Sequence, residues 1–179
     1  MIATMSRTYI KRDCILWGIL LASYLVFIYG LSLHKTDNRP QGSNLLTEED
    51  RQELFASIAS TSDESEIIKR CSKMACKKLS FRRKNNLNLG EANCVGYAQY
   101  TTSLLNAAFK YKGLSSKARP VVGQVHLYGL NLHPLAMSIM PNNFKSFFKD
   151  HDFVEIRKEK GDTIYIDTSL QDLIGKTFI

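Results

Sequence analysis

Nineteen consecutive residues without a charge, 15–33, constrain this chain more than any other feature of its sequence. The run is mostly apolar and includes Trp17, Tyr24 and Tyr29. A helix of about 20 apolar residues is long enough to cross the hydrocarbon core of a bilayer. The sequence therefore predicts a single transmembrane helix near the N-terminus.

The charges that flank this run predict its orientation. Arg7, Lys11 and Arg12 precede it, whereas only Lys35 and Arg39 follow it closely. This excess favours a signal anchor in which residues 1–14 are cytoplasmic and the rest of the protein is extracytoplasmic, periplasmic or extracellular. A cleaved signal peptide is the alternative, but the run is longer than a usual signal core and no Ala-x-Ala-like site follows it.

One domain of ordinary size follows the anchor. Residues 34–46 are polar and contain Pro40 and Gly42, which is typical of a linker. Residues 47–179 remain for the domain, and a chain of 179 residues has room for one hydrophobic core of that size. The sequence leaves the oligomeric state open.

Charge and cysteine spacing argue against some classes of function. The formal charge of +7 is spread along the chain, and the densest basic stretch, 69–84, contains only one aromatic residue, Phe81. We interpret that stretch as a solvated helix face rather than a nucleic-acid site. The cysteines form no CxxC pair or other metal-ligand spacing, so we expect no metal and no cofactor. They are Cys14, Cys71, Cys76 and Cys94.

Periodicity and capping signals predict the elements of the domain. Helices are expected over 48–58, 64–79 and 94–111. Strands are expected over 117–128, 151–156 and 163–168. Residues 129–150 have no regular pattern, except that Asn143 suits the cap of a short helix that carries three phenylalanines.

The helix over 94–111 places a cysteine at its N-terminal end. Asn93 is a good N-cap, and Gly113 with the preceding lysines is a common helix exit. Cys94 would then lie in the first turn, where the helix dipole and unpaired N–H groups favour a thiolate. Alternatively, Cys94 is a small core residue, as most free cysteines are.

The last two strands bring a histidine near a carboxylate. A three-residue loop that ends at Gly161 suits a hairpin, because glycine readily adopts a positive φ. In that register Val154 faces Ile166, and His151 lies diagonally opposite Asp167 on one face. A two-residue loop would place the two side chains on opposite faces. Cys94, His151 and Asp167 would then supply a nucleophile, a base and an orienting group.

The sequence resembles the transglutaminase-like superfamily of papain-type cysteine enzymes over about 63–169. The family's Gly-x-Cys-x-x-Tyr-Ala, Gly-Ile-Pro-Ala-Arg-x-Val-x-Gly, His-Ala-Trp-Val-Glu-Val and Asp-Pro-Thr segments have counterparts here in the same order. The matching stretches are Asn93-Cys94-Val95-Gly96-Tyr97-Ala98, residues 113–123, His151-Asp152-Phe153-Val154-Glu155-Ile156 and Tyr165-Ile166-Asp167-Thr168-Ser169. The departures are Ala92, Phe153 and Thr168, where the family usually has Gly, Trp and Pro.

This resemblance implies an α+β fold in which the cysteine-bearing helix packs on an antiparallel sheet. It also implies acyl transfer on peptide or amide bonds through a thioester, with a protein or peptide as the substrate. Hydrolysis is favoured over crosslinking, since nothing evident builds a site for an amine. The alternative is a catalytically silent interaction domain that keeps the fold and binds a protein partner.

The same resemblance implies roles for individual residues. Cys94 would attack the carbonyl carbon, His151 would move the proton, and Asp167 would orient His151. The backbone N–H of Cys94 would hold the oxyanion, with Asn88 as the candidate for the second donor. Asn85, Asn86 and Asn93 compete with Asn88 for that role, and His126 is a rival base that lacks an orienting carboxylate.

Overall fold

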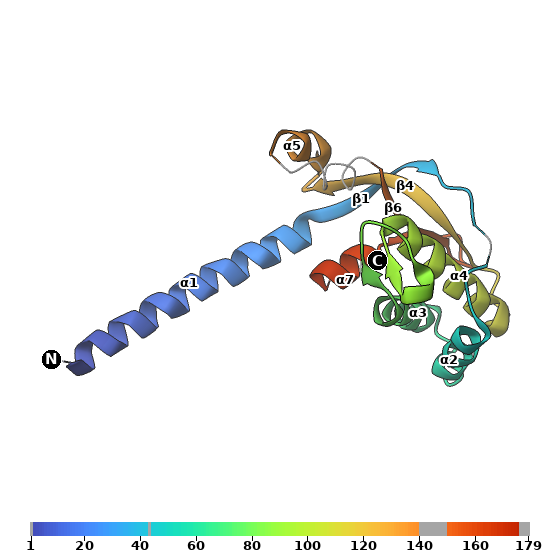
Figure 1. Cartoon of the computed structure of the whole chain (residues 1–179), viewed down its shortest axis with the longest axis horizontal. Coiled ribbons are helices and arrows are strands. Elements are labelled where there is room, and N and C mark those ends of the chain that lie inside the picture. The colour runs from blue at the N-terminus through green and yellow to red at the C-terminus, as the bar shows by residue number, and fades with distance from the viewer. Residues whose placement is uncertain (1, 43, 140–149, 176–179) are drawn as a thin grey trace.

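The computed structural model describes residues 2–42, 44–139 and 150–175, and it shows an α+β domain with one long helix attached (Figure 1). The side chains of residues 2–14, 135–137 and 139 are not described. The predicted cap at Asn143 and its three phenylalanines lie outside the described residues. The expected α+β class is confirmed, with helices packed on a curled antiparallel sheet.

Helix α1 (Ile2–Gly30) projects from one side of the domain (Figure 1). Two tyrosines hold its C-terminal half against the domain: Tyr24 Oη donates to the Ile174 carbonyl at 2.7 Å, and Tyr128 Oη donates to the Val26 carbonyl at 2.5 Å. Within the fully described part of the chain, no helix combines the length and the apolar character needed to cross a bilayer.

Strand β1 (Leu31–Asn38) follows α1 directly, and its position differs from two boundaries that the sequence predicted. The predicted helix over 15–33 ends at Gly30 instead of residue 33, and the predicted linker over 34–46 is wrong for residues 34–38. Leu31 and Leu33 pair with Leu127 and Val125 in an antiparallel ladder. Their side chains pack in a small apolar cluster on that sheet. This packing makes the segment more stable as a strand than as a free linker.

The main sheet has the strand order β1-β4-β6-β7, and all of its neighbouring strands are antiparallel. The long central strand β4 (Lys117–Leu127) pairs with β1 on one side and with β6 (His151–Arg157) on the other. Strand β7 (Thr163–Ile166) closes one edge. The predicted strands 117–128, 151–156 and 163–168 are thus confirmed within two residues at each end.

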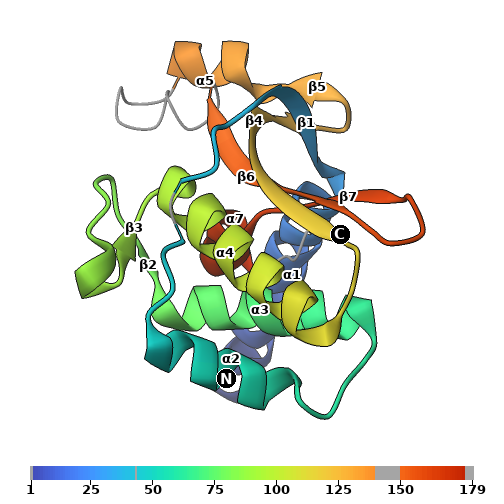
Figure 2. The same cartoon turned by 90° about the vertical axis from the view of Figure 1, so that its right-hand side faces the viewer.

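Helix α4 (Cys94–Lys112) lies between the sheet and two outer helices, α2 (Glu48–Ile58) and α3 (Glu64–Lys78) (Figure 2). Its apolar side chains form the centre of the main core, where Leu104 and Leu105 are fully buried. All three helices occur where the sequence predicted them. Thr47 and Asp50 form the capping box of α2, and Asp63 caps α3.

The closing hairpin has the predicted register. Val154 pairs with Ile166 and Ile156 with Ile164 across β6 and β7. The turn closes because Lys158 N–H donates to the Asp162 carbonyl at 2.8 Å, with Gly161 at φ 89°. Helix α7 (Thr168–Ile174) then begins immediately after Asp167.

The segments between these elements are more structured than the sequence predicts. Residues 129–150 were expected to be irregular, but they contain β5 (Leu130–Asn131) and α5 (Leu132–Ile139). The loop before Cys94 contains the short strands β2 (Ser80–Phe81) and β3 (Glu91–Ala92), which pair in parallel, and the 3-10 helix η1 (Leu87–Leu89). The short strands among these elements form through pairing with another strand, which local periodicity does not report.

Candidate active site

Cys94 occupies the first turn of α4, as the sequence predicts. The Asn93 side chain accepts a hydrogen bond from Gly96 N–H at 3.2 Å, which caps the helix. At the other end Gly113, at φ 69°, closes the helix. The Cys94 side chain is partly exposed, so it combines a helix N-terminus with access to solvent.

An asparagine of the preceding loop fixes this first turn. Asn85 Oδ1 accepts a hydrogen bond from Asn93 N–H at 2.7 Å. Asn93 Nδ2 in turn donates to the Arg83 carbonyl at 3.3 Å. The loop therefore determines where the helix begins and, with it, where the sulfur of Cys94 lies.

His151 and Asp167 form a buried pair. His151 Nε2 hydrogen-bonds to Asp167 Oδ2, and the two residues are 0% and 2% exposed. The second carboxylate oxygen, Oδ1, accepts from Ser169 N–H and Leu170 N–H, each at 3.0 Å, and from Ser169 Oγ at 2.7 Å. Asp167 is thus the N-cap of α7 as well as the partner of His151, and its position is fixed from both sides.

Cys94 lies near enough to His151 to act on its pKa, which groups the three side chains. Burial lowers the pKa of His151, but the charge and hydrogen bond of Asp167, with a smaller contribution from Cys94, outweigh burial and raise that pKa from 6.5 to about 10. His151 is therefore an imidazolium at neutral pH. Since Nε2 faces Asp167, Nδ1 is the ring nitrogen that can serve Cys94.

The structure thus brings together the three side chains that the sequence singled out, and their catalytic roles stay a prediction. An imidazolium beside a thiol at a helix N-terminus can stabilise a thiolate, which is the nucleophilic form of cysteine. Asp167 makes the largest contribution that favours the buried charge on His151. The arrangement is a cysteine at a helix N-terminus near a protonated imidazole that one carboxylate holds.

A second ion pair borders this group and was missed at the sequence level. Arg39 Nε and Nη2 donate to the two carboxylate oxygens of Asp152 at 2.7 and 2.8 Å. The hydrogen bond with Asp152 raises the pKa of Arg39 most, burial opposes it, and the charges of Asp152, Cys94 and Asp150 add to the increase. Asp152 follows His151 directly, but nothing in the sequence near Arg39 indicates that it pairs with Asp152.

Asn88 and His126 lie elsewhere. Asn88 lies in η1 and lines a separate cavity of about 430 Å³ with Asp50, Lys78 and Tyr100, and that lining includes none of Cys94, His151 and Asp167. The loop is drawn to the end of α3 because Ser80 N–H donates to the Gly90 carbonyl at 2.7 Å. His126 stacks on His34, with ring centroids 4.0 Å apart.

Comparisons with known proteins leave the site to be interpreted from its own geometry. No family model matches the sequence, and a search of curated proteins finds no significant relative. Among the described residues, no group of three or more His, Cys, Asp or Glu side chains is arranged to hold a metal ion.

Proposed function

We propose that this protein is a cysteine acyl-transfer enzyme with a Cys94–His151–Asp167 triad, acting on peptide or amide bonds through a thioester. The observation that carries the proposal is the buried hydrogen bond between His151 and Asp167, with Cys94 near enough to add to the rise of the His151 pKa. The resemblance to transglutaminase-like enzymes and their papain-like core supports it further. Hydrolysis remains the favoured outcome, with water as the acyl acceptor.

In this proposal the reaction begins with the Cys94 thiolate and the His151 imidazolium. The sulfur attacks the carbonyl carbon, and the backbone N–H groups at the start of α4 stabilise the negative charge on the carbonyl oxygen. His151 then gives its proton to the leaving amine, which departs as the thioester forms. A water molecule, deprotonated by His151, attacks the thioester and releases the acid and the free thiol.

The deciding experiment is alkylation by iodoacetamide at pH 6, with the modified cysteine identified by mass spectrometry. We expect fast labelling of Cys94 that His151→Ala abolishes. Cys71 and Cys76 are internal controls, because burial raises the pKa of each thiol to about 12 and both should stay unlabelled. Labelling of Cys94 no faster than a model thiol would instead support the silent interaction domain.

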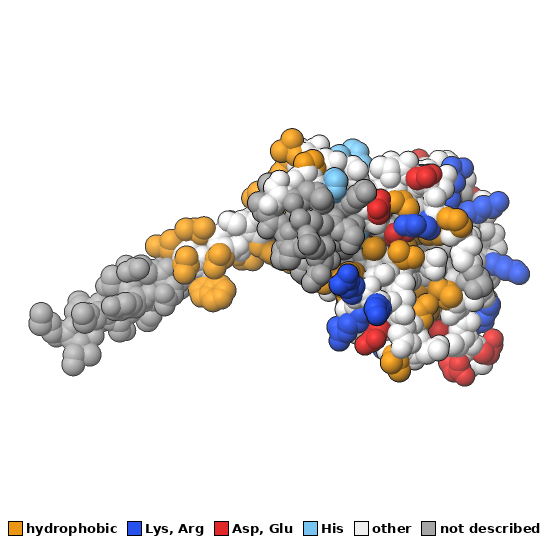
Figure 3. All heavy atoms as spheres, turned by 45° about the horizontal axis from the view of Figure 1, so that its top comes forward, with side chains coloured by type: hydrophobic (Ala, Val, Ile, Leu, Met, Phe, Trp, Pro, Cys, Tyr) orange, Lys and Arg blue, Asp and Glu red, His pale blue; other side chains and the backbone are white. Residues whose placement is uncertain are grey.

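We also propose that α1 attaches the domain to a membrane, with the N-terminus cytoplasmic and the domain outside the cytoplasm. Apolar side chains along the described part of α1 are exposed, as Figure 3 shows, and Trp17 is 71% exposed. A continuous apolar surface of this kind is costly in water and marks a site that another apolar phase covers. The charge excess before residue 15 supports the orientation.

This attachment is tested by membrane fractionation and by protease treatment of a tag placed after Ile179. We expect the protein to sediment with membranes and the tag to be digested from the extracytoplasmic side. Leu20→Lys with Leu21→Lys should release the protein, whereas the control Leu89→Lys, at an exposed site on the domain, should not. A tag protected in the cytoplasm would contradict the orientation.

A further inference from the structure

We infer that the domain rests on the bilayer into which α1 inserts, with the turn 128–130 and the end of α7 in the interfacial layer of that bilayer. The inference rests on the proposed membrane attachment of α1. It goes beyond that attachment, because an anchor by itself leaves the domain free to lie away from the lipid.

Helix α1 is joined to the domain without a linker. Strand β1 begins at the residue after the last residue of α1. The hydrogen bond from Tyr24 to the Ile174 carbonyl fastens the helix to the end of α7. The hydrogen bond from Tyr128 to the Val26 carbonyl fastens it to the turn 128–130. The direction of the helix in the bilayer therefore sets the direction of the domain.

These contacts lie at the depth where α1 leaves the bilayer. The uncharged run begins at residue 15, and residues 15–30 rise about 24 Å along a helix. The hydrocarbon core of a bilayer is about 30 Å thick, so α1 has to place its last turns within the bilayer in order to cross it. Val26 is about 6 Å from the end of the helix, and Tyr128 binds its carbonyl. The turn is therefore at the bilayer surface and not above it.

Tyr128 has an unusual backbone conformation for its residue type. Its φ is 49°, and within the described part of the chain it is the one residue other than glycine with a positive φ. Asn or Gly suits such a position better, and another L-residue there costs about 1 kcal/mol. A Cβ on Gly30 would lie 2.3 Å from the Tyr128 ring, so the ring packs on the end of α1. The strained turn thus keeps a tyrosine where helix and domain meet, and tyrosines are enriched at the membrane–water interface.

Exposed apolar side chains lie next to this junction. Leu130 follows Tyr128 in the turn and is 73% exposed, and Leu173 at the end of α7 is exposed as well. Asp172 of α7 is directed to α4, because it accepts a hydrogen bond from Tyr97 Oη at 2.7 Å. Figure 1 shows α5 and α7 on the side of the domain from which α1 projects. This side therefore presents apolar groups at the level of the lipid headgroups.

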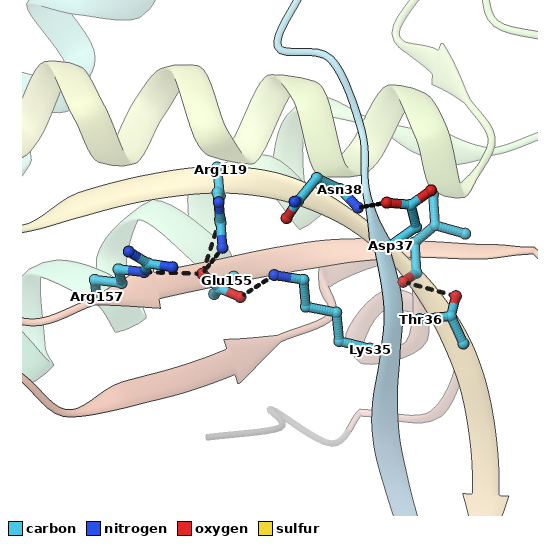
Figure 4. Close-up of polar contacts among 8 residues, drawn as sticks. Lys35, Thr36, Asp37, Asn38, Arg119, Glu155 and Arg157 are labelled. Atoms are coloured by element: carbon cyan, nitrogen blue, oxygen red, sulfur yellow. Dashed lines mark hydrogen bonds and ion pairs between the residues drawn. The ribbon is translucent and has the colours of Figure 1, made fainter.

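The strand segments that adjoin α1 contain no Asp, Glu, Lys or Arg. None of these residues occurs between Arg119 and Lys145, a range that includes most of β4 and all of β5 and α5. In β1 the first charged residue is Lys35. Figure 4 shows the contrast, since Lys35, Arg119 and Arg157 gather around Glu155 in the half of the sheet farther from α1. The charged half of the sheet thus faces water, and the uncharged half lies beside the lipid.

Quenching of tryptophan fluorescence by brominated lipid tests this placement, with the full-length protein in phosphatidylcholine vesicles. Bromine near the headgroup end of the acyl chains quenches only those tryptophans that reach the lipid. Trp17 is the single tryptophan of the chain, so Trp17→Phe with Leu130→Trp reports on the turn alone. The fluorescence of this variant should fall by about half relative to vesicles without bromine, as expected for a tryptophan at headgroup level.

Leu89 supplies the matched control, because it is 72% exposed and Leu130 is 73% exposed. Leu89 lines the separate cavity together with Thr47, which caps α2, and Figure 1 shows α2 at the side of the domain away from α1. Trp17→Phe with Leu89→Trp should therefore keep its fluorescence. Both variants carry the same aromatic ring at equally exposed sites, so the affinity of tryptophan for lipid does not explain a difference between them.

The protein with Trp17 in place reports on the attachment itself. Quenching of Trp17 without quenching at position 130 would overturn the inference and leave the attachment intact, and equal quenching at positions 130 and 89 would overturn the inference too. Absence of quenching at both Trp17 and position 130 would overturn attachment and inference together. Where circular dichroism shows that Leu130→Trp alters the fold, Trp17→Phe with Leu173→Trp tests the end of α7 in the same way.

Discussion

His151 and Asp167 lie 16 residues apart in sequence and share a hydrogen bond in the interior of the domain, where neither side chain reaches solvent. The pair joins the start of β6 to the first turn of α7. Each charge is compensated by the other, and the carboxylate also accepts hydrogen bonds from Ser169 and Leu170. The stability of the domain therefore depends on this contact.

The first prediction concerns pH. The folded pKa of His151 lies near 10 and its ordinary value is 6.5, so the folded protein holds this proton more tightly than the unfolded chain does. The resulting stability is fully present below about pH 6.5 and is lost as the pH rises towards 10. In urea unfolding, the difference between wild type and His151→Gln should therefore shrink from pH 6 to pH 10. An equal difference at both pH values would contradict this view of the pair.

The second prediction separates the charge of Asp167 from its role as a helix cap. Asp167→Asn keeps an oxygen for the N–H groups of Ser169 and Leu170 but removes the charge that faces His151. Breaking a buried ion pair in this way should lower the free energy of unfolding by about 3 kcal/mol at pH 7. Asp167→Ala also removes the cap and should cost about 1 kcal/mol more. Equal losses in the two variants, measured by urea unfolding, would count against a separate capping role.

The third prediction concerns Asn93, which caps the cysteine helix. Asn93→Ala should lower the free energy of unfolding by about 1 kcal/mol, since Gly96 N–H loses its acceptor. Asn93→Asp keeps the cap but loses the donor to the Arg83 carbonyl, so it should also lose about 1 kcal/mol of stability. Its negative charge next to Cys94 should make alkylation several-fold slower at pH 6. If both variants alkylate at the wild-type rate, the start of α4 does not tune the sulfur.

The fourth prediction tests the close approach of β1 to β4 beside His151. A Cβ on Gly123 would lie 2.1 Å from the His34 carbonyl oxygen and 2.7 Å from the Phe153 ring. Because backbone cannot yield easily, Gly123→Ala should lower the free energy of unfolding by about 3 kcal/mol. In Gly42→Ala the nearest atoms belong to the flexible side chain of Gln99, at 3.4 Å. This variant should change the free energy of unfolding by less than about 0.5 kcal/mol. Thermal unfolding with no difference between the two variants would show that the strands separate at little cost.

Much of the fold follows from local signals that the sequence carries by itself. Asn93 caps the helix that it was expected to cap, and Thr47 and Asp63 cap α2 and α3, because an N-cap depends on one side chain and the N–H groups within three residues of it. Gly161 fixed the hairpin register for the same reason, and with it the neighbourhood of His151 and Asp167.

Only the tertiary structure decided how distant segments meet. Residues 34–38 have the polar composition of a linker, but they form a strand because β4 offers them a free edge. Asn85, rather than Asn88, reaches the turn of Cys94, since pairing between β2 and β3 orients the loop. Arg39 forms an ion pair with Asp152, which lies 113 residues away in sequence. Local sequence patterns determine helices, strands and turns, because these depend on short-range hydrogen bonds and on periodicity. Contacts between distant residues depend instead on which surfaces face each other once the helices and strands have packed.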